Sequence, residues 1–345
     1  MGEARHRYSR QQSFQPIGPA GQAKLGRKHV LIVGAGALGS GIADILARAG
    51  VGIMTIIDRD VVEWSNLQRQ TLYDEQDAAE QAPKAIAAAR RLRQINSDID
   101  IRAHVMDCGA AGLKELFDSS PIDLIMDATD NYELRFILND IAYCYDVPWI
   151  HGACSGSYGV TYNFMPQDTP CLHCLLSRVP LGAATCDRDG VIAPAVQMVV
   201  ALQAGEAIKW LSGNHACMSD RYTVFDQWSN TFQSFRIHAE KRDASCPTCG
   251  THRTYPYLRS EAAWKTEVLC GRTTVSIRPP QRSGVDLDEL ARTLRRSGKR
   301  VASNPYLVQV EDGEQRIVIF ADGRALVHGT SDSVTARKLY HRYLG

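Results

Sequence analysis

The sequence has almost no excess of either charge, because 39 Lys and Arg residues stand against 38 Asp and Glu residues and leave a net charge of +1. Proteins that bind nucleic acids or anionic membranes by general attraction carry a large basic excess. We therefore expect neither nucleic acid nor a membrane among the partners. Any charged partner must be recognised by a local patch.

A long apolar run is also missing. No stretch approaches the roughly 18 uninterrupted apolar residues that a membrane-spanning helix needs. Residues 1–14 are polar and charged, without the apolar core of a secretory signal. We expect a cytoplasmic protein.

Cysteine is sparse, since ten residues in 345 are too few for a disulfide scaffold. Four of them form two C-x-x-C pairs, Cys171 with Cys174 and Cys246 with Cys249. Neither pair opens a helix after a βαβ strand, as a thioredoxin-type redox site requires. Four thiolates with no water-bearing position are typical of a closed, tetrahedral zinc site. We predict that these four residues bind a structural Zn²⁺.

What the sequence does contain, from residue 27 to about residue 165, is an alternation of short apolar runs with helical periodicity. The expected strands are 29–33, 52–57, 101–106, 123–127 and 148–151, and the expected helices are 38–49, 83–95, 111–118 and 131–145. Strands 158–164, 222–226 and 231–237, with a helix over 194–211, are expected to continue the sheet in antiparallel fashion. We predict an α/β fold with a Rossmann-like mixed sheet and helices on both faces.

A second unit is expected after a linker. We place the first domain at 1–250, the linker at 251–265 and a small α+β domain at 266–345. The latter should contain a strand-like segment 266–277, a helix near 287–294, a hairpin of 317–320 and 324–328, and a closing helix 333–344. A basic cluster near its first helix is either a solvated helix face or a docking surface for an acidic partner; it comprises Arg282, Arg292, Arg295, Arg296, Lys299 and Arg300.

A glycine-rich turn follows the first apolar strand. In Gly34-Ala35-Gly36-Ala37-Leu38-Gly39, two glycines let the backbone approach a phosphate, and the third lets the helix pack on the strand. Asp58 ends the next strand, where a carboxylate can accept both hydroxyls of a ribose. The turn predicts nucleotide binding without choosing between NAD and ATP.

Three separated cations, Arg10, Arg69 and Lys84, accompany this turn. The two phosphates of a dinucleotide do not need them, whereas a triphosphate undergoing cleavage does, because charge develops on the leaving pyrophosphate. Asp130 follows the fourth strand and is the best-placed carboxylate to hold Mg²⁺. The alternative is that Asp130 only caps the helix that begins near Asn131.

Together these residues resemble the ThiF/MoeB/HesA family, the bacterial relatives of ubiquitin-activating enzymes. The resemblance runs from residue 7 to about residue 250. It rests on Arg7-Tyr8-x-Arg10-Gln11, the glycine turn, Asn66-Leu67-Gln68-Arg69-Gln70, Pro83-Lys84, Thr129-Asp130-Asn131 and both C-x-x-C pairs in order.

The resemblance implies that the C-terminal glycine carboxylate of a small ubiquitin-like sulfur carrier ending in Gly-Gly attacks the α-phosphate of ATP. The nucleotide-binding set it implies is Gly34, Gly36, Gly39, Asp58, Asn66, Arg69, Lys84, Asp130 and Asn131. Asp58 would hold the ribose, Asp130 would bind Mg²⁺, and Arg10 would reach the triphosphate from the opposite subunit of a homodimer. Sulfur would come from a separate donor such as a cysteine desulfurase or a rhodanese, for thiamine or molybdopterin synthesis.

One further cysteine, Cys186, lies in a polar loop beside Arg188 and ahead of the helix led by Pro194. In the ThiF branch of the family a cysteine here takes the activated acyl group or receives a persulfide. The alternative is a loop thiol without a covalent role. Alternatives to the whole interpretation are an NAD-dependent oxidoreductase and a related enzyme that adenylates a peptide or a tRNA.

Overall fold

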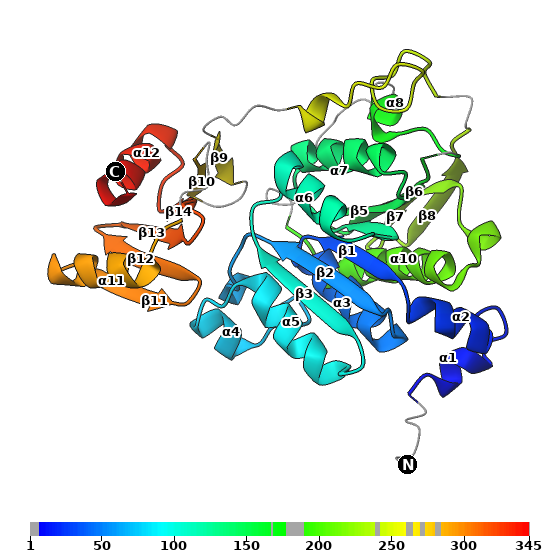
Figure 1. Cartoon of the computed structure of the whole chain (residues 1–345), viewed down its shortest axis with the longest axis horizontal. Coiled ribbons are helices and arrows are strands. Elements are labelled where there is room, and N and C mark those ends of the chain that lie inside the picture. The colour runs from blue at the N-terminus through cyan, green and yellow to red at the C-terminus, as the bar shows by residue number, and fades with distance from the viewer. Residues whose placement is uncertain are drawn as a thin grey trace. The chain divides into compact units, whose positions relative to one another are not determined.

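The computed structural model describes residues 7–166, 168–176, 190–238, 242–259, 265–269, 273–279 and 284–344 (Figure 1). Contacts divide the chain into two units, Met1–Ser260 and Glu261–Gly345. Leu258, in the segment expected as a linker, is buried in the core of the first unit. In the described parts of the chain, no helix combines the length and hydropathy needed to cross a membrane.

The first unit is built on one eight-stranded sheet with the order β3-β2-β1-β4-β5-β6-β7-β8. Its strands are β1 (His29–Val33), β2 (Ile53–Asp58), β3 (Asp100–Val105), β4 (Leu124–Asp127), β5 (Trp149–Ser155), β6 (Tyr158–Phe164), β7 (Arg221–Asp226) and β8 (Thr231–Arg236). Strands β1 to β5 pair in parallel, and β5 to β8 pair in antiparallel fashion. The predicted Rossmann-like mixed sheet is confirmed.

Helices cover both faces of this sheet (Figure 1). The helical elements are α1 (Ser9–Ser13), α2 (Gly18–Leu25), α3 (Ala37–Ala49), η1 (Trp64–Asn66), α4 (Glu75–Ala79), α5 (Lys84–Ile95), α6 (Ala110–Ser119), α7 (Tyr132–Cys144), α8 (Leu172–Leu176), α10 (Ala193–Ser212), η2 (His215–Cys217) and η4 (Pro256–Leu258). In β1, Val30 and Ile32 face a core with α3, α5 and α10, whereas Leu31 and Val33 face a core with α6 and α7. This explains why the strand is apolar at every position.

The second unit is a six-stranded antiparallel sheet with the order β11-β12-β13-β14-β10-β9. Its elements are β9 (Lys265–Leu269), β10 (Thr274–Arg278), α11 (Leu287–Arg296), β11 (Arg300–Asn304), β12 (Leu307–Asp312), β13 (Gln315–Phe320), β14 (Ala325–His328) and α12 (Ser333–Leu344). Ala291 of α11 and Leu339 of α12 join its apolar core. The predicted small α+β domain is confirmed as a separate sheet with the helices α11 and α12.

One strand prediction in this unit was wrong. Residues 266–277 do not form one continuous strand, because β9 and β10 are antiparallel neighbours in which Leu269 pairs with Thr274. A single strand of that length would leave its end without a partner, whereas folding it back pairs both halves.

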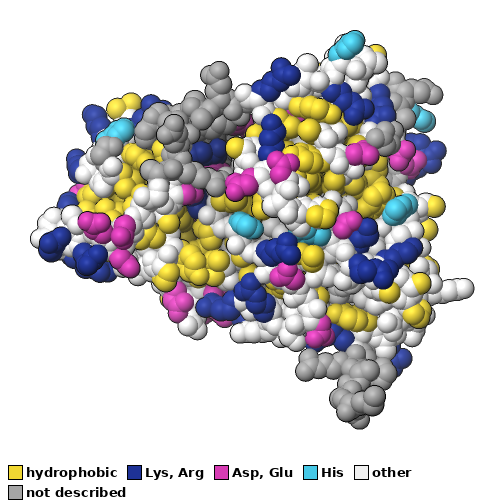
Figure 2. All heavy atoms as spheres, in the orientation of Figure 1, with side chains coloured by type: hydrophobic (Ala, Val, Ile, Leu, Met, Phe, Trp, Pro, Cys, Tyr) yellow, Lys and Arg dark blue, Asp and Glu magenta, His cyan; other side chains and the backbone are white. Residues whose placement is uncertain are grey.

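Two residues of the basic cluster near α11, Lys299 and Arg300, pair with carboxylates of the same unit. Arg295 donates to Ser303 Oγ (2.8 Å), Lys299 pairs with Asp312 (2.8 Å), and Arg300 pairs with Glu311 (3.4 Å). Figure 2 shows basic and acidic side chains side by side over α11. These pairs favour the solvated helix face over a docking surface for an acidic partner, while Arg282 lies outside the described residues.

Candidate active site and metal centre

The glycine turn connects β1 to α3. Gly34 has a φ of +96°, and a Cβ there would lie 2.5 Å from the carbonyl oxygen of Ala128. A Cβ on Gly39 would lie 1.9 Å from the carbonyl oxygen of Gly34. A Cβ on Gly36 would meet nothing closer than Gln70 Nε2, at 3.9 Å. Gly34 and Gly39 are therefore required by the turn itself, and Gly36 leaves open space at the amino end of α3, where an anion is favoured.

The peptide of Ala35 inside this turn is held from both sides. Its N–H donates to Asp58 Oδ2 (2.6 Å), and its carbonyl accepts from the hydroxyl of Tyr73 (2.6 Å). The Tyr73 hydroxyl also lies 3.2 Å from the carbonyl oxygen of Lys84. Tyr73 thus ties the glycine turn to the start of α5, a contact that the sequence did not predict.

Lys84 is the first residue of α5, and its side chain is buried. Its Nζ lies 3.3 Å from Asp60 Oδ2. Burial raises the pKa of Asp58, and the Lys84 ammonium opposes that rise. A buried ammonium next to carboxylates at the phosphate end of a glycine turn is a positive charge available to a polyphosphate.

Asn66 and Arg69 lie at and just after the short helix η1. Asn66 is fully buried, and its Oδ1 accepts the N–H of Glu63 at 3.1 Å. Arg69 is half-buried, and its Nη1 donates to the carbonyl of Ser65 at 2.9 Å. These hydrogen bonds tie both side chains to the backbone of their own loop and thereby fix the positions of the two side chains.

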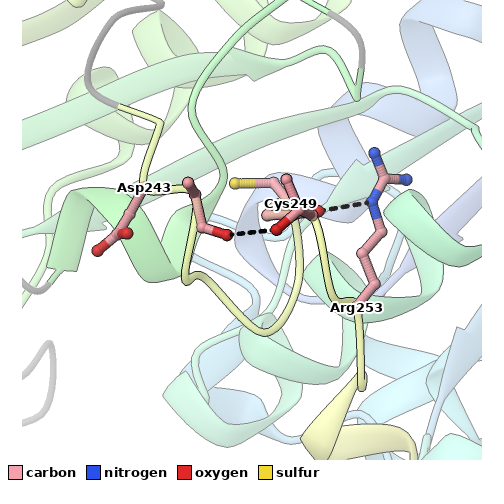
Figure 3. Close-up of a pocket in the computed structure, with 6 residues that line it drawn as sticks. Asp243, Cys249 and Arg253 are labelled. Atoms are coloured by element: carbon pink, nitrogen blue, oxygen red, sulfur yellow. Dashed lines mark hydrogen bonds between the residues drawn. The ribbon is translucent and has the colours of Figure 1, made fainter.

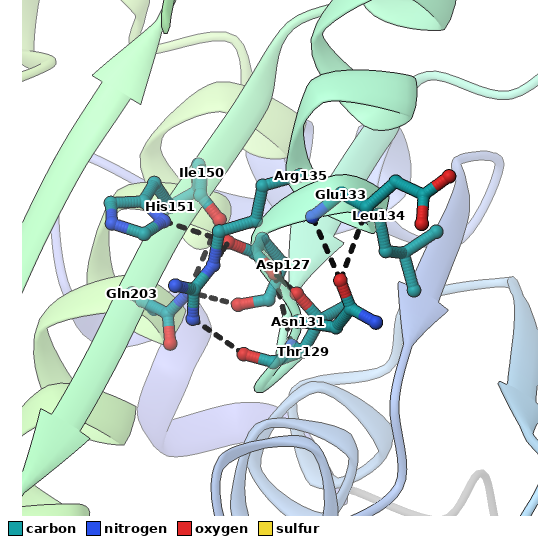
Figure 4. A network of polar contacts seen from close by, with 9 residues as sticks. All are labelled: Asp127, Thr129, Asn131, Glu133, Leu134, Arg135, Ile150, His151 and Gln203. Atoms are coloured by element: carbon teal, nitrogen blue, oxygen red, sulfur yellow. Dashed lines mark hydrogen bonds and ion pairs between the residues drawn. The ribbon is translucent and has the colours of Figure 1, made fainter. Parts of the chain in front are cut away.

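Asp127 ends β4 and is followed by the loop that carries Asp130. Figure 4 shows the side chains that surround the Asp127 carboxylate. This carboxylate is fully buried and accepts from Thr129 N (2.9 Å), Thr129 Oγ1 (2.7 Å), Arg135 Nε (3.2 Å) and His151 Nδ1 (2.7 Å). Burial opposes ionisation, but the Arg135 guanidinium and the hydrogen bonds from His151 and Thr129 hold the pKa of Asp127 below its ordinary value. Burial lowers the pKa of His151, so the imidazole is neutral and its Nδ1 carries the donated proton.

Asp130 itself is exposed, and its carboxylate makes no hydrogen bond or ion pair with the described residues. The cap of α7 is Asn131, whose Oδ1 accepts from Glu133 N (2.7 Å) and Leu134 N (3.3 Å). The alternative that Asp130 caps this helix was therefore wrong. Its carboxylate remains available for a ligand.

These residues gather at one edge of the sheet. Gly34, Asp58 and Asp127 end or directly follow the neighbouring parallel strands β1, β2 and β4. The chain runs outward from β1 through β2 and β3 and then returns to the other side at β4, so β1 and β4 flank the topological switch point. Ligands of open α/β sheets bind there, outside the carboxyl ends of the strands.

Arg10 is the predicted cation that this single chain does not bring to that edge. It is exposed on α1, whose Gln11 donates to the carbonyl of Ala49, the last residue of α3 (2.9 Å). The glycine turn lies at the other end of α3, which has 13 residues. A helix of that length spans about 20 Å, farther than an arginine side chain reaches.

The four predicted zinc ligands form a buried cluster with all four sulfur atoms within 4.8 Å of one another. The Sγ atoms of Cys171 and Cys174 are 3.8 Å apart, those of Cys171 and Cys246 are 3.5 Å apart, and those of Cys174 and Cys249 are 3.4 Å apart. Thiolates about 2.3 Å from a zinc ion form a tetrahedron with edges of about 3.8 Å. The cluster therefore fits a tetrahedral metal site.

A surface hollow of about 640 Å³ lies beside this cluster (Figure 3). It is lined by Asp243, Ala244, Cys249, Gly250, Thr251 and Arg253. Arg253 Nε donates to the carbonyl of Gly250 at 3.3 Å, and Thr251 N donates to the carbonyl of Ala244 at 3.0 Å. All these residues belong to the second cysteine loop, so the hollow is a feature of the cysteine cluster and not of the glycine turn. Cys186 lies outside the described residues.

Comparison with known proteins places these features in a family. Residues 8–248 match the ThiF family. The sulfur carrier protein ThiS adenylyltransferase of Bacillus subtilis is 49% identical over 339 residues, which cover 98% of this chain and 99% of that protein. The molybdopterin-synthase adenylyltransferase of Escherichia coli is 37% identical over 245 residues, covering 71% of this chain and 96% of that protein.

A solved structure shares the fold. The crystal structure of E. coli MccB with ATP aligns with a TM-score of 0.60 at 23% identity, covering 71% of this chain and 75% of that one. Because the family match spans more than half of the sequence, and a relative is similar along almost all of it, the chain belongs to the ThiF family.

Proposed function

We propose that this protein uses ATP to adenylate the C-terminal glycine carboxylate of a ubiquitin-like sulfur carrier protein and releases pyrophosphate. The observation that carries the proposal is that the edge of the sheet with the glycine turn carries both a buried ammonium, that of Lys84, and an exposed carboxylate, that of Asp130. A nicotinamide dinucleotide has only two phosphates, which are not cleaved, so its binding requires neither the cation of Lys84 nor a metal ligand at Asp130. A metal-bound triphosphate uses both.

The nucleotide would be held by the chain's own groups at that edge. The open face of Gly36 and the first N–H groups of α3 would receive phosphate oxygens, and the carboxylate of Asp58 would accept the ribose hydroxyls. Lys84, Arg69 and Asn66 would contact the remaining phosphates. Asn131 is engaged as the helix cap, so we assign it the positioning of Asp130 and not a direct contact.

The residues present fit a magnesium ion. Asp130 offers an exposed, hard carboxylate oxygen at the carboxyl end of β4, which suits Mg²⁺ better than softer metals. Bound with the nucleotide, the ion would neutralise charge on the phosphate oxygens. We likewise propose zinc at the four cysteines, as a structural centre.

The chemical step needs positioning and charge neutralisation but no general base. A carboxylate is already ionised at neutral pH, so one of its oxygens can form the new bond to the α-phosphorus. The bond from that phosphorus to the oxygen bridging to the β-phosphorus breaks, and its electron pair leaves with pyrophosphate. Lys84, Arg69 and Arg10 would absorb the charge that develops on the leaving group.

The position of Arg10 supports a homodimer. Since α1 is anchored at the far end of α3, Arg10 would complete the site of a second copy related by a twofold axis. Residues 266–345 lack the glycine-rich, cysteine-first loop with which a rhodanese domain donates sulfur, so sulfur would come from a separate protein such as a cysteine desulfurase or a rhodanese.

We further propose a carrier of the ThiS type and hence a role in thiamine synthesis. The B. subtilis ThiS adenylyltransferase is similar along 98% of this chain, including the second unit. The molybdopterin-synthase adenylyltransferase covers only 71% of the chain.

Exchange of labelled pyrophosphate into ATP tests the proposal. Exchange should require both the chain and a ThiS-type carrier, and a carrier that lacks its last glycine is the matched control. Exchange that depends on the intact tail supports adenylation. No exchange, combined with tight binding of NAD, would support an oxidoreductase instead.

A further inference from the structure

The Asp130 loop is fixed at nearly every peptide around the exposed carboxylate. Ala128 N donates to the carbonyl of Val33 in β1 at 3.0 Å. The N–H of Thr129 donates to Asp127 Oδ1, and its carbonyl accepts from Arg135 Nη2 at 2.6 Å. On the other side, Asn131 caps α7. Asp130 therefore lies between two residues whose backbone is held in place, while its own side chain points to no described partner.

A single buried ion pair organises these contacts (Figure 4). Arg135 contacts Asp127 through Nε and the carbonyl of Thr129 through Nη2, so one guanidinium joins the end of β4 to the peptide that precedes Asp130. Arg135 is 6% exposed and Asp127 is 0% exposed. Gln203 holds the same strand end from α10, donating to the carbonyls of Asp127 (2.9 Å) and Ile150 (3.1 Å).

Burying such an ion pair removes both charges from water at a large cost in free energy. The pair is therefore weak evidence, by itself, that it stabilises the fold. All four contacts of the Asp127 carboxylate go to donors in or beside the loop, and each oxygen has two of them. The planar guanidinium of arginine also donates its hydrogen bonds in fixed directions, whereas the ammonium of lysine does not. The network therefore determines where the loop lies more than it contributes to the free energy of folding.

We propose that Asp127 and Arg135 are positioning residues that hold the loop so that the carboxylate of Asp130 is already oriented for the divalent cation of the bound nucleotide. The inference rests on the proposed function. Neither residue touches the nucleotide. Both act through Asp130, as residues behind a metal ligand orient it.

Arg135→Lys tests this, because it keeps the charge beside Asp127 and loses the fork to Thr129. The readout is Mn²⁺ binding in the presence of a non-cleavable ATP analogue, followed by electron paramagnetic resonance, together with the melting temperature of each variant. We expect the apparent dissociation constant for Mn²⁺ to rise about tenfold, as for other groups that orient metal ligands. Asp130→Asn should lose the bound cation.

Arg90→Lys is the matched control, since Arg90 of α5 pairs with the buried Asp77 of α4 and contacts no residue of the loop. If Arg135→Lys does not fold, Thr129→Val carries the test, because it keeps the side-chain shape and removes one donor to Asp127; its Mn²⁺ affinity should fall in the same direction. Wild-type Mn²⁺ affinity in the folded Arg135→Lys or Thr129→Val variant would overturn the inference. An equal loss of Mn²⁺ affinity in Arg90→Lys would also overturn it. Absence of carrier-dependent exchange in the wild type would instead remove the proposed function.

Discussion

Individual side chains in this site hold the backbone more often than they point into open space. Ala35 is clamped between the carboxylate of Asp58 and the hydroxyl of Tyr73, and Tyr73 also reaches the carbonyl of Lys84. The glycine turn and the buried lysine are therefore held at a fixed separation. Pre-ordering of this kind reduces the conformational freedom that must be lost when the nucleotide binds.

Tyr73→Phe should weaken ATP binding with little change in fold. Removing the hydroxyl leaves the carbonyl of Ala35 without its donor, which costs about 1 kcal/mol, or about a fivefold rise in the Kd for ATP. Isothermal titration measures that change. Tyr340→Phe is the control, because its hydroxyl makes a comparable bond to Gly323 (2.7 Å) in the second unit. An unchanged Kd in Tyr73→Phe would contradict the clamp.

Cys186→Ala separates adenylation from sulfur transfer. If Cys186 takes the activated acyl group or receives a persulfide, the variant should retain pyrophosphate exchange and lose carrier thiocarboxylate formation. Mass spectrometry of the carrier, with a sulfur donor present, distinguishes the two activities. Wild-type thiocarboxylate yield in the variant would remove the covalent role.

At the level of elements, the predictable parts are those whose burial produces a regular pattern. Strands β1 and β4 are buried at every position, α3 buries nine of its 13 residues and α5 buries six of its 12, so their sequences identify them. The expectations missed β12, although this strand buries Leu307, Val308 and Val310. They also missed α2, which buries only Gly21, Gln22 and Leu25, and β11, in which no residue is buried. An element that buries few residues shows no apolar periodicity from which it can be predicted.

The same distinction applies to the site. The glycine turn and the cysteine pairs have fixed local spacing, and the structure brings each set together as predicted. Arg135 and His151 were not predicted, because their role depends on Asp127 being buried between α7 and β5. The aspartate before Ala128-Thr129, at the end of a buried strand, was the available signal. Sequence alone also could not choose between Asp130 and Asn131 as the cap, since both types favour that position.

Removing the metal should loosen the first unit. A metal ion held by all four thiolates would cross-link the two cysteine loops, and its removal breaks that link. We expect Cys246→Ser or chelation to lower the melting temperature by about 5 °C or more. Calorimetry and metal analysis on the same samples measure this. Cys144→Ser, an exposed thiol outside the cluster, should keep its zinc. Metal-free protein that melts like the wild type would contradict a structural role.

For the whole molecule, the proposed contact of Arg10 with the triphosphate requires a second chain, because Arg10 lies far from the glycine turn of its own chain. Arg7 donates to the carbonyl of Ile95 at 2.8 Å, and Tyr8 accepts from Asn96 at 2.8 Å, so α1 is fastened at the end of α5 as well as of α3. Both anchors lie at the carboxyl ends of these helices, away from Lys84 and the glycine turn. A second copy is then the simplest source of the missing cation.

Mixed dimers test this arrangement. Arg10→Ala and Lys84→Ala chains should each be inactive alone. Mixing them after reversible dissociation should restore about a quarter of wild-type exchange, since half of the dimers are mixed and each has one intact site. Arg10→Ala mixed with itself is the control. No recovery in the mixture would mean that Arg10 acts within its own chain.

Adenylation of the carrier is tested most directly by the intact mass of a Gly-Gly-ended ThiS-type carrier, measured after incubation with the enzyme, ATP and Mg²⁺ and rapid acid quenching. We predict a mass increase of one adenylyl group, located on the terminal glycine and absent when that glycine is removed or when Lys84→Ala replaces the wild type. A carrier of unchanged mass, with every component folded and ATP bound, would contradict the proposed activity.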